Sequence, residues 1–144
     1  MLRLSKPKKR ISRAKILLVD DQVDMVEMVQ HQLELSGWEV ITSGNGKEGL
    51  ERAASEKPDV IVLDINMPIM NGHDMLRGLR KDPDLKDTAV IMCATSGEIE
   101  DVTRAMSYNV CGYVTKPFDY TELRGKILDA LEDKTSDSCT GSGR

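Results

Sequence analysis

Five apolar runs alternate with five amphipathic stretches along most of this chain. The first run is continuously apolar up to the acids that end it, which is typical of a strand buried on both faces of a parallel sheet. The runs are KILLVDD at 15–21, WEVITSG at 38–44, DVIVLD at 59–64, AVIMCA at 89–94 and CGYVT at 111–115. The pattern therefore predicts five strands in this order.

The stretches between the runs have the spacing of helices with one buried face. Asp119 and Glu122 form a capping-box pattern that predicts the start of the last helix. The expected inward residues are Val23, Val26, Val29 and Leu33 in a helix stopped by Gly37, then Leu50, Ala53 and Ala54 within 47–57, then a helix over 73–81, then Ile99, Val102 and Met106, and finally Leu123, Ile127 and Leu131.

Five strand–helix units in succession predict a parallel sheet with helices on both faces. In such sheets the chemistry gathers beyond the carboxyl ends of the strands. The residues at those ends are Asp20 and Asp21 after the first strand, Asp64 after the third, Ala94 after the fourth and Lys116 after the fifth.

Three carboxylates and one lysine are therefore expected in one crevice. Carboxylates so close repel, so a proton or a cation must join them. Mg²⁺ prefers oxygen ligands and often binds phosphate oxygens, and lysine is a compact partner for a phosphoryl group. An aspartate oxygen can attack phosphorus to form an acyl phosphate. We therefore expect phosphoryl transfer to Asp64.

The segments ILLVDD, VIVLDINMPIMNG and VTKPF, in this order, resemble the response regulator receiver family of two-component signalling over roughly residues 15–133. The resemblance implies a doubly wound five-stranded parallel α/β sheet, a (βα)5 flavodoxin-like fold with strand order 2-1-3-4-5. It also implies a signalling switch rather than an enzyme, limited to self-phosphorylation and autodephosphorylation. Its phosphoryl donor would be a histidine kinase or a histidine phosphotransfer protein.

Carried over residue by residue, the resemblance makes Asp64 the phosphoacceptor and Lys116 the phosphate-binding lysine. Asp21, Asp64 and the backbone carbonyl of Asn66 would be the Mg²⁺ ligands, with Asp20 acting through water. The bond from Lys116 to Pro117 would be cis, and Tyr113 would be the aromatic whose rotation reports activation.

One position departs from the family pattern, which has Thr or Ser at the end of the fourth strand. Counting 30 residues forward from Asp64 or 22 back from Lys116 gives Ala94, and Thr95 follows it. Either the strand slips by one residue and Thr95 supplies the hydroxyl, or the coupling from the phosphate to Tyr113 is weakened. Slippage would turn the strand's side chains to the opposite face, so we favour the weakened coupling.

Charge divides the chain into three parts: a basic flexible arm at 1–14, a receiver domain at 15–134 and a disordered polar tail at 135–144. The arm holds six basic residues and no acid, which leaves 14 basic against 24 acidic residues elsewhere. An acidic body disfavours general nucleic-acid binding. No apolar run is long enough for a membrane span or an export signal, so we expect a cytoplasmic protein.

The only Phe and all three Tyr lie between residues 108 and 120. Aromatic residues are enriched at interfaces, so we expect a downstream protein partner to bind the face formed by residues 98–133, while local core packing remains the alternative. We read His31 and His73 as surface residues and expect a monomer or weak dimer with no output domain after residue 134. Two other functions stay open: a nucleic-acid-associated regulator using the arm, and a metal-dependent phosphohydrolase. Asn66 weighs against the phosphohydrolase, because a second acid is expected there.

Overall fold

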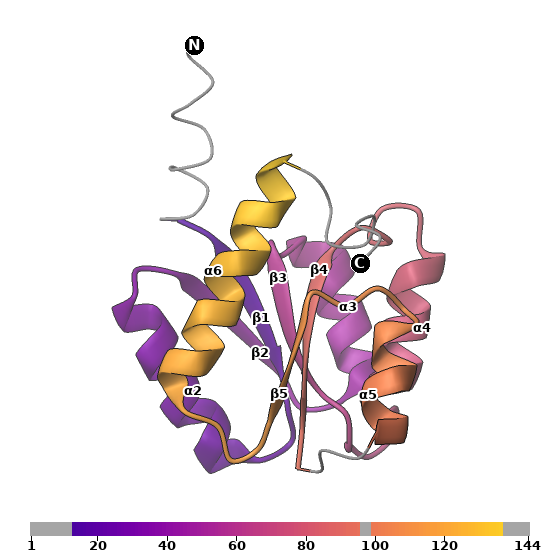
Figure 1. The fold of residues 1–144 in the computed structure, drawn as a ribbon, viewed down its shortest axis with the longest axis horizontal. Coiled ribbons are helices and arrows are strands. Elements are labelled where there is room, and N and C mark those ends of the chain that lie inside the picture. Colours follow the sequence, from indigo (N-terminus) through magenta and orange to yellow (C-terminus); the bar gives the residue numbers. More distant parts are fainter. Residues whose placement is uncertain (1–12, 96–98, 137–144) are drawn as a thin grey trace.

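A computed structural model describes residues 13–95 and 99–136, so most of the predicted basic arm (residues 1–12 of 1–14) and most of the predicted tail (137–144) lie outside the described residues. Five strands form one parallel sheet in the order β2-β1-β3-β4-β5, which confirms the predicted architecture (Figure 1). The strands are β1 (Lys15–Val19), β2 (Glu39–Ser43), β3 (Val60–Asp64), β4 (Ala89–Ala94) and β5 (Gly112–Thr115).

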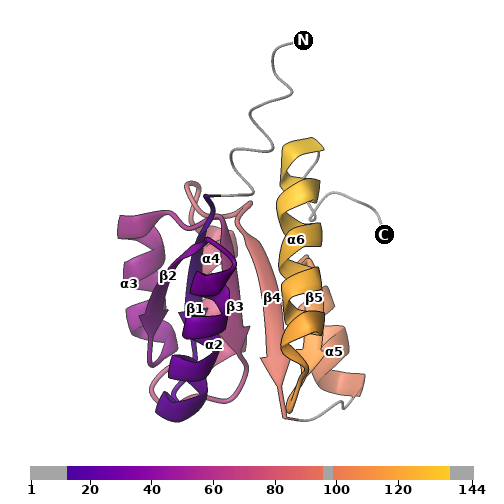
Figure 2. The same ribbon diagram turned by 90° about the vertical axis from the view of Figure 1, so that its left-hand side faces the viewer.

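Helices α2 (Val23–Leu35) and α6 (Tyr120–Ser136) cover one face of the sheet. The other face is covered by α3 (Gly46–Glu56), α4 (Gly72–Lys81) and α5 (Ile99–Met106). Figures 1 and 2 show the sheet between these two helical layers. Helix α6 runs past the domain boundary that we expected at residue 134.

The central strands alternate between two separate cores. In β1, Ile16 and Leu18 join the core under α2 and α6, while Leu17 and Val19 join the core under α3 and α4. Strands β3 and β4 divide their side chains in the same way. This double burial explains why the strands read as continuous apolar runs.

Three helix faces were predicted too broadly. Val23 and Met106 are exposed, at 66% and 51%, although both match the helical spacing of their segments. Ala54 is also exposed, while Ala53 beside it is fully buried. The predicted capping box is wrong in detail, because the Asp119 carboxylate accepts the backbone N–H of Thr121 rather than that of Glu122.

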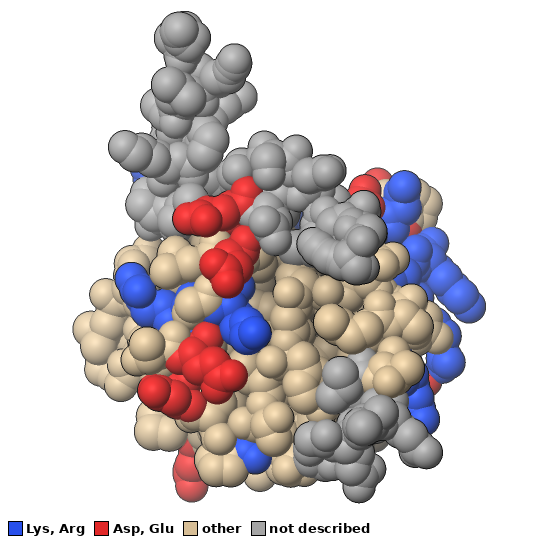
Figure 3. Space-filling view, in the orientation of Figure 1, with Lys and Arg blue, Asp and Glu red and all other residues tan. Residues whose placement is uncertain are grey.

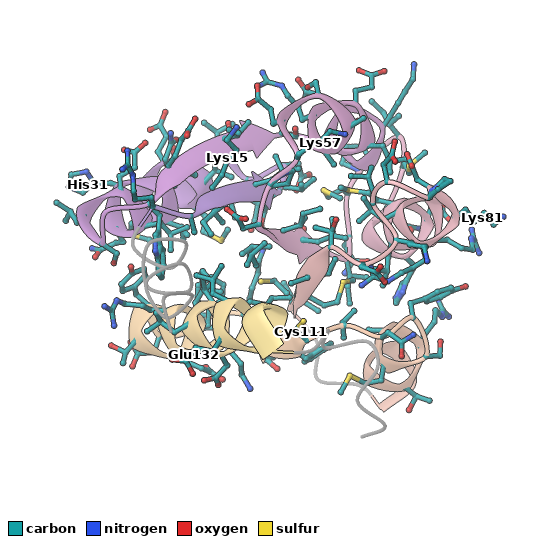
Figure 4. All side chains as sticks on the ribbon, turned by 90° about the horizontal axis from the view of Figure 1, so that it is seen from above. Lys15, His31, Lys57, Lys81, Cys111 and Glu132 are labelled. Atoms are coloured by element: carbon teal, nitrogen blue, oxygen red, sulfur yellow. The ribbon has the colours of Figure 1, made fainter. Side chains whose placement is uncertain are left out.

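Charged side chains of both signs lie over the α6 side of the molecule, and basic ones gather at the edge formed by α4 (Figure 3). His31, Lys57 and Lys81 lie at the outside of the helical layers (Figure 4). Within the described part of the chain, no helix is both long and apolar enough to cross a bilayer.

Candidate functional site at the carboxyl edge of the sheet

Three strands bring their end residues together at one edge of the sheet. Asp20 directly follows β1, Asp64 is the last residue of β3, and Lys116 directly follows β5. All three are buried: Asp20 and Asp64 are 4% exposed and Lys116 is 9% exposed. Buried charges need partners, and here the partners are one another.

The Lys116 ammonium lies between the acids. Its Nζ donates a hydrogen bond to Asp20 Oδ2 at 2.7 Å and lies 3.4 Å from Asp64 Oδ1. Burial alone would lower the pKa of Lys116, but the hydrogen bond to Asp20 and the charges of Asp64 and Asp20 outweigh it, so the pKa is raised. Lys116 therefore stays charged and faces the predicted acceptor.

The carboxylates of Asp20, Asp21 and Asp64 form a cluster in which one oxygen of each lies within 4.8 Å of the others. Asp21 is exposed, and the other two are buried. Burial and the charge of Asp20 raise the pKa of Asp64 from 3.8 to about 6, although Lys116 acts in the opposite direction. One ammonium therefore does not neutralise the cluster.

This excess negative charge, presented only by oxygen atoms, fits a divalent cation such as Mg²⁺. Asp20, Asp21 and Asp64 would hold it from the protein side. Asn66 is exposed and lies two residues beyond Asp64. That its backbone carbonyl binds the metal stays a prediction.

The loop after Asp64 is folded tightly against the sheet edge. The Gly72 N–H donates to the Ile65 carbonyl at 2.8 Å, and a Cβ at residue 72 would collide with the carbonyl oxygen of Asp64. On the other side, the Gly46 N–H donates to the Met70 carbonyl at 3.0 Å. At the tip, Ile69 has φ 68° and is 79% exposed, a backbone conformation that strains a β-branched residue.

Strand β4 does not slip at its end. Ala94 is fully buried and pairs with Thr115, while Asp64 pairs with Cys93. Ala94 faces the core under α3 and α4. Thr95 instead helps to line an apolar pocket of about 430 Å³ on the α2 side, with Met25, Met28 and Phe118. The side chain at the end of β4 is therefore a methyl group.

The remaining predicted features can also be located. The bond between Lys116 and Pro117 is cis, as predicted. Tyr113 is half-buried, and it packs with Tyr108 against the core under α3 and α4. Phe118 and Tyr120 pack against the opposite core. The four aromatic residues are therefore divided between two layers, which favours core packing over one shared docking patch.

Sequence reasoning missed two features of this region. The side chain of Gln22 accepts a hydrogen bond from Lys116 Nζ at 3.0 Å, across 94 positions of sequence. No local pattern marks such a contact. His73, which we expected at the surface, is only 6% exposed. It lies in the first turn of α4, on the buried face that this helix shares with Leu76.

The fold and the site together define a doubly wound α/β protein with an acidic, lysine-containing pocket at the carboxyl ends of its strands. A family model described as the response regulator receiver domain matches residues 16–128. The chain belongs to this family, the receiver domains of two-component response regulators.

Individual relatives agree with this assignment. The chain is 35% identical over 117 residues to the alkaline phosphatase synthesis transcriptional regulatory protein PhoP of Bacillus subtilis, with 81% of this chain and 48% of that protein covered. It is 33% identical over 121 residues to the probable transcriptional regulator ycf27 of Cyanophora paradoxa, covering 84% and 49%. The chain thus spans about half the length of the curated relatives it matches.

Solved structures of shorter proteins match almost end to end. The chemotaxis protein CheY4 of Vibrio cholerae superposes with a TM-score of 0.77 at 32% identity, covering 81% of this chain and 98% of that one. A CheY-like receiver domain protein from Methanospirillum hungatei gives a TM-score of 0.80 at 26% identity, covering 86% and 98%.

Proposed function

We propose that this domain is a phosphorylatable switch that accepts a phosphoryl group on Asp64 and then changes its affinity for a protein partner. The observation that carries the proposal is the 3.4 Å separation between Lys116 Nζ and Asp64 Oδ1 inside a cluster of three carboxylates. A nucleophile, a fixed positive charge and an oxygen-only cation site are the parts that phosphoryl transfer needs.

The chemistry requires one bond to form and one to break. A carboxylate oxygen of Asp64 forms a bond to phosphorus, while the bond from phosphorus to the donor nitrogen or oxygen breaks and its electron pair leaves with the donor. Lys116 donates hydrogen bonds to the phosphoryl oxygens and holds them against Asp64. Bound Mg²⁺ would supply charge neutralisation for those oxygens. Water attack on the acyl phosphate later restores the carboxylate and releases inorganic phosphate.

The family relationship supports a histidine kinase or a histidine phosphotransfer protein as the donor, and a signalling role rather than enzymatic turnover. We retain the surface formed by residues 98–133 as the proposed site for the downstream partner, although its aromatic residues pack largely inward. Replacing Tyr108 with Ala should lower the affinity for that partner, and an unchanged affinity would count against this surface.

Ala94 sets the strength of the switch. With a buried methyl group at the end of β4, no side-chain hydroxyl at that position can bond the phosphoryl group. Thr95 lies toward the apolar pocket on the other side of the strand. We therefore propose weak coupling between the phosphoryl group and Tyr113, by comparison with family members that carry Thr or Ser there.

Incubation with acetyl phosphate and Mg²⁺, followed by intact-mass measurement, tests the main proposal. We expect the mass of one phosphoryl group to be gained by the natural protein and not by Asp64→Asn. An Asp64→Asn variant that gains the same mass would refute Asp64 as the acceptor. Turnover of a generic phosphate ester would instead favour the phosphohydrolase.

A further inference from the structure

Three acceptors surround the Lys116 ammonium, and only one of them is uncharged. Asp20 Oδ2 lies 2.7 Å from Nζ, Gln22 Oε1 lies 3.0 Å from it, and Asp64 Oδ1 lies 3.4 Å from it. An ammonium has three N–H donors. The amide of Gln22 therefore takes one donor that would otherwise turn to a carboxylate.

Gln22 occupies the N-cap position of α2, but its side chain does not cap the helix. At the equivalent positions, Asn45 accepts the backbone N–H of Glu48 and Asn71 accepts that of Asp74, each at 2.9 Å. A short Ser, Thr, Asp or Asn is the usual residue at an N-cap. Here a longer side chain leaves the helix end without a cap and reaches Lys116 instead.

The backbone holds Gln22 in place for this contact. Its N–H donates to Asp20 Oδ1 at 2.9 Å, and its carbonyl accepts the N–H of Val26 at 2.9 Å. Asp20 therefore binds the Gln22 backbone with one oxygen and Lys116 with the other. The three side chains form one connected arrangement, and a change at Gln22 reaches Lys116 directly.

We propose that Gln22 is a positioning residue that aims the Lys116 ammonium at the phosphoryl group during its transfer to Asp64. This inference rests on the proposed function. Of the three acceptors, Asp20 belongs to the candidate metal site and Asp64 is the proposed nucleophile, so both change partners when the site is loaded. Gln22 is the acceptor that neither binds the metal nor reacts, so its hydrogen bond to Lys116 persists while the phosphoryl group is transferred.

Without this amide, the contacts within the described part of the chain leave the ammonium only carboxylates to bind, and Asp20 Oδ2 is the nearer. A tighter Lys116–Asp20 pair opposes a divalent cation at Asp20 and draws the ammonium away from the incoming phosphoryl group. Two effects follow from this single cause. The domain binds Mg²⁺ more weakly, and Asp64 takes up the phosphoryl group more slowly.

The test compares two substitutions that separate positioning from folding. Gln22→Met keeps the length of the side chain but has no amide. Gln22→Asn is too short to reach Lys116 but is a favoured N-cap residue. Gln32→Met, further along α2, is the matched control for glutamine loss. Each protein receives acetyl phosphate with Mg²⁺, so that the acetyl–phosphate P–O bond breaks, acetate leaves with the electron pair and Asp64 gains the phosphoryl group.

We expect both Gln22 variants to be phosphorylated about three- to tenfold more slowly, since the typical net contribution of one hydrogen bond corresponds to roughly this factor and Gln22 is exposed to water. Calorimetric titration with Mg²⁺ alone should show weaker binding for both. The thermal midpoint of Gln22→Asn should equal or exceed that of the natural protein. A residue with only a structural role would not produce this combination of a better-capped helix and slower transfer.

Normal rates and normal Mg²⁺ affinity in both Gln22 variants would overturn the inference while leaving Asp64 phosphorylation intact. Slower transfer only in the variant that melts earlier would also overturn it, because that result describes a folding defect. If the natural protein itself gains no phosphoryl group, the proposed function is wrong, and so is the inference that rests on it. That outcome is distinct, because it appears before any variant is compared.

Discussion

The carboxylate cluster should make the metal-free domain less stable at neutral pH than its Asp64→Asn variant. Asp64 has its pKa raised from 3.8 to about 6, chiefly by burial and then by the charge of Asp20. The folded state therefore holds this proton more tightly than the unfolded state does. Stability from this group is present at low pH and is lost as the pH rises from about 4 to about 6.

The size of the effect follows from that pKa. One pKa unit corresponds to about 1.4 kcal/mol, so a rise of this extent destabilises the ionised form by up to about 3 kcal/mol. Asn resembles the protonated carboxyl group in shape and charge. We expect Asp64→Asn to be more stable by about 3 kcal/mol at about pH 7.5 and by roughly half of that at about pH 5.

Urea unfolding followed by the fluorescence of Trp38, the single tryptophan, which is 5% exposed, measures these differences. Samples with a chelator report the metal-free state. Adding Mg²⁺ should reduce the difference in free energy of unfolding between the two proteins, because a ligand of the folded state stabilises the natural protein more than a variant that lacks one carboxylate. Asp129→Asn, at an exposed position on α6, is the control and should show no such pattern. An Asp64→Asn variant no more stable than the natural protein at either pH would refute the reasoning.

Three further predictions concern other parts of the domain. Ile69→Gly should raise the free energy of unfolding by about 1 kcal/mol in urea titration, because φ 68° strains a β-branched residue and the side chain buries little; an unchanged or lower value would contradict this. Arg80 donates hydrogen bonds to the carbonyls of Lys86, Thr88, Tyr108 and Asn109. Arg80→Lys should therefore lower the free energy of unfolding almost as much as Arg80→Ala does, by about 2 kcal/mol, because an ammonium cannot reproduce the planar set of donors. Thermal unfolding measures the difference, and an Arg80→Lys variant as stable as the natural protein would contradict this prediction. Ala94→Thr should change the lifetime of the phosphorylated form or its affinity for a partner, and constancy of both would show that the methyl group at residue 94 is unimportant.

The fold could be predicted from the sequence because buried strands differ in composition from the rest of the chain. Strands β1, β3 and β4 are buried on both faces and therefore consist almost wholly of apolar residues. The ends of β1 and β3 then locate Asp20 and Asp64, and the end of the shorter strand β5 locates Lys116, since the carboxyl ends of parallel strands share one edge. Helix faces were less certain. Val23 and Met106 fit the helical period, but each lies at an end of its helix, beyond the reach of the core.

Contacts between residues far apart in the sequence produce no such local pattern. Gln22 is an ordinary polar residue at a helix start until Lys116, 94 positions away, is placed beside it. Arg80 is equally inconspicuous in sequence, yet it holds the turn before β5 through the carbonyls of Tyr108 and Asn109. Burial lowers the pKa of its guanidinium, but nearby Asp87 acts against this. Such roles depend on how the loops close, which hydrophobic periodicity does not determine.

Departures from local rules gather at one edge of this domain. Asp64 is a buried acid in a cluster that one ammonium does not neutralise, Gln22 leaves a helix end without a side-chain cap, and Ile69 holds a left-handed backbone conformation. Gly72 lets the chain approach Asp64 more closely than any side chain would permit. Natural sequences keep such departures mainly where function requires them. Because all four lie at strand ends or in loops at the carboxyl edge of the sheet, they support the same site as the family relationship does, on grounds that do not depend on similarity.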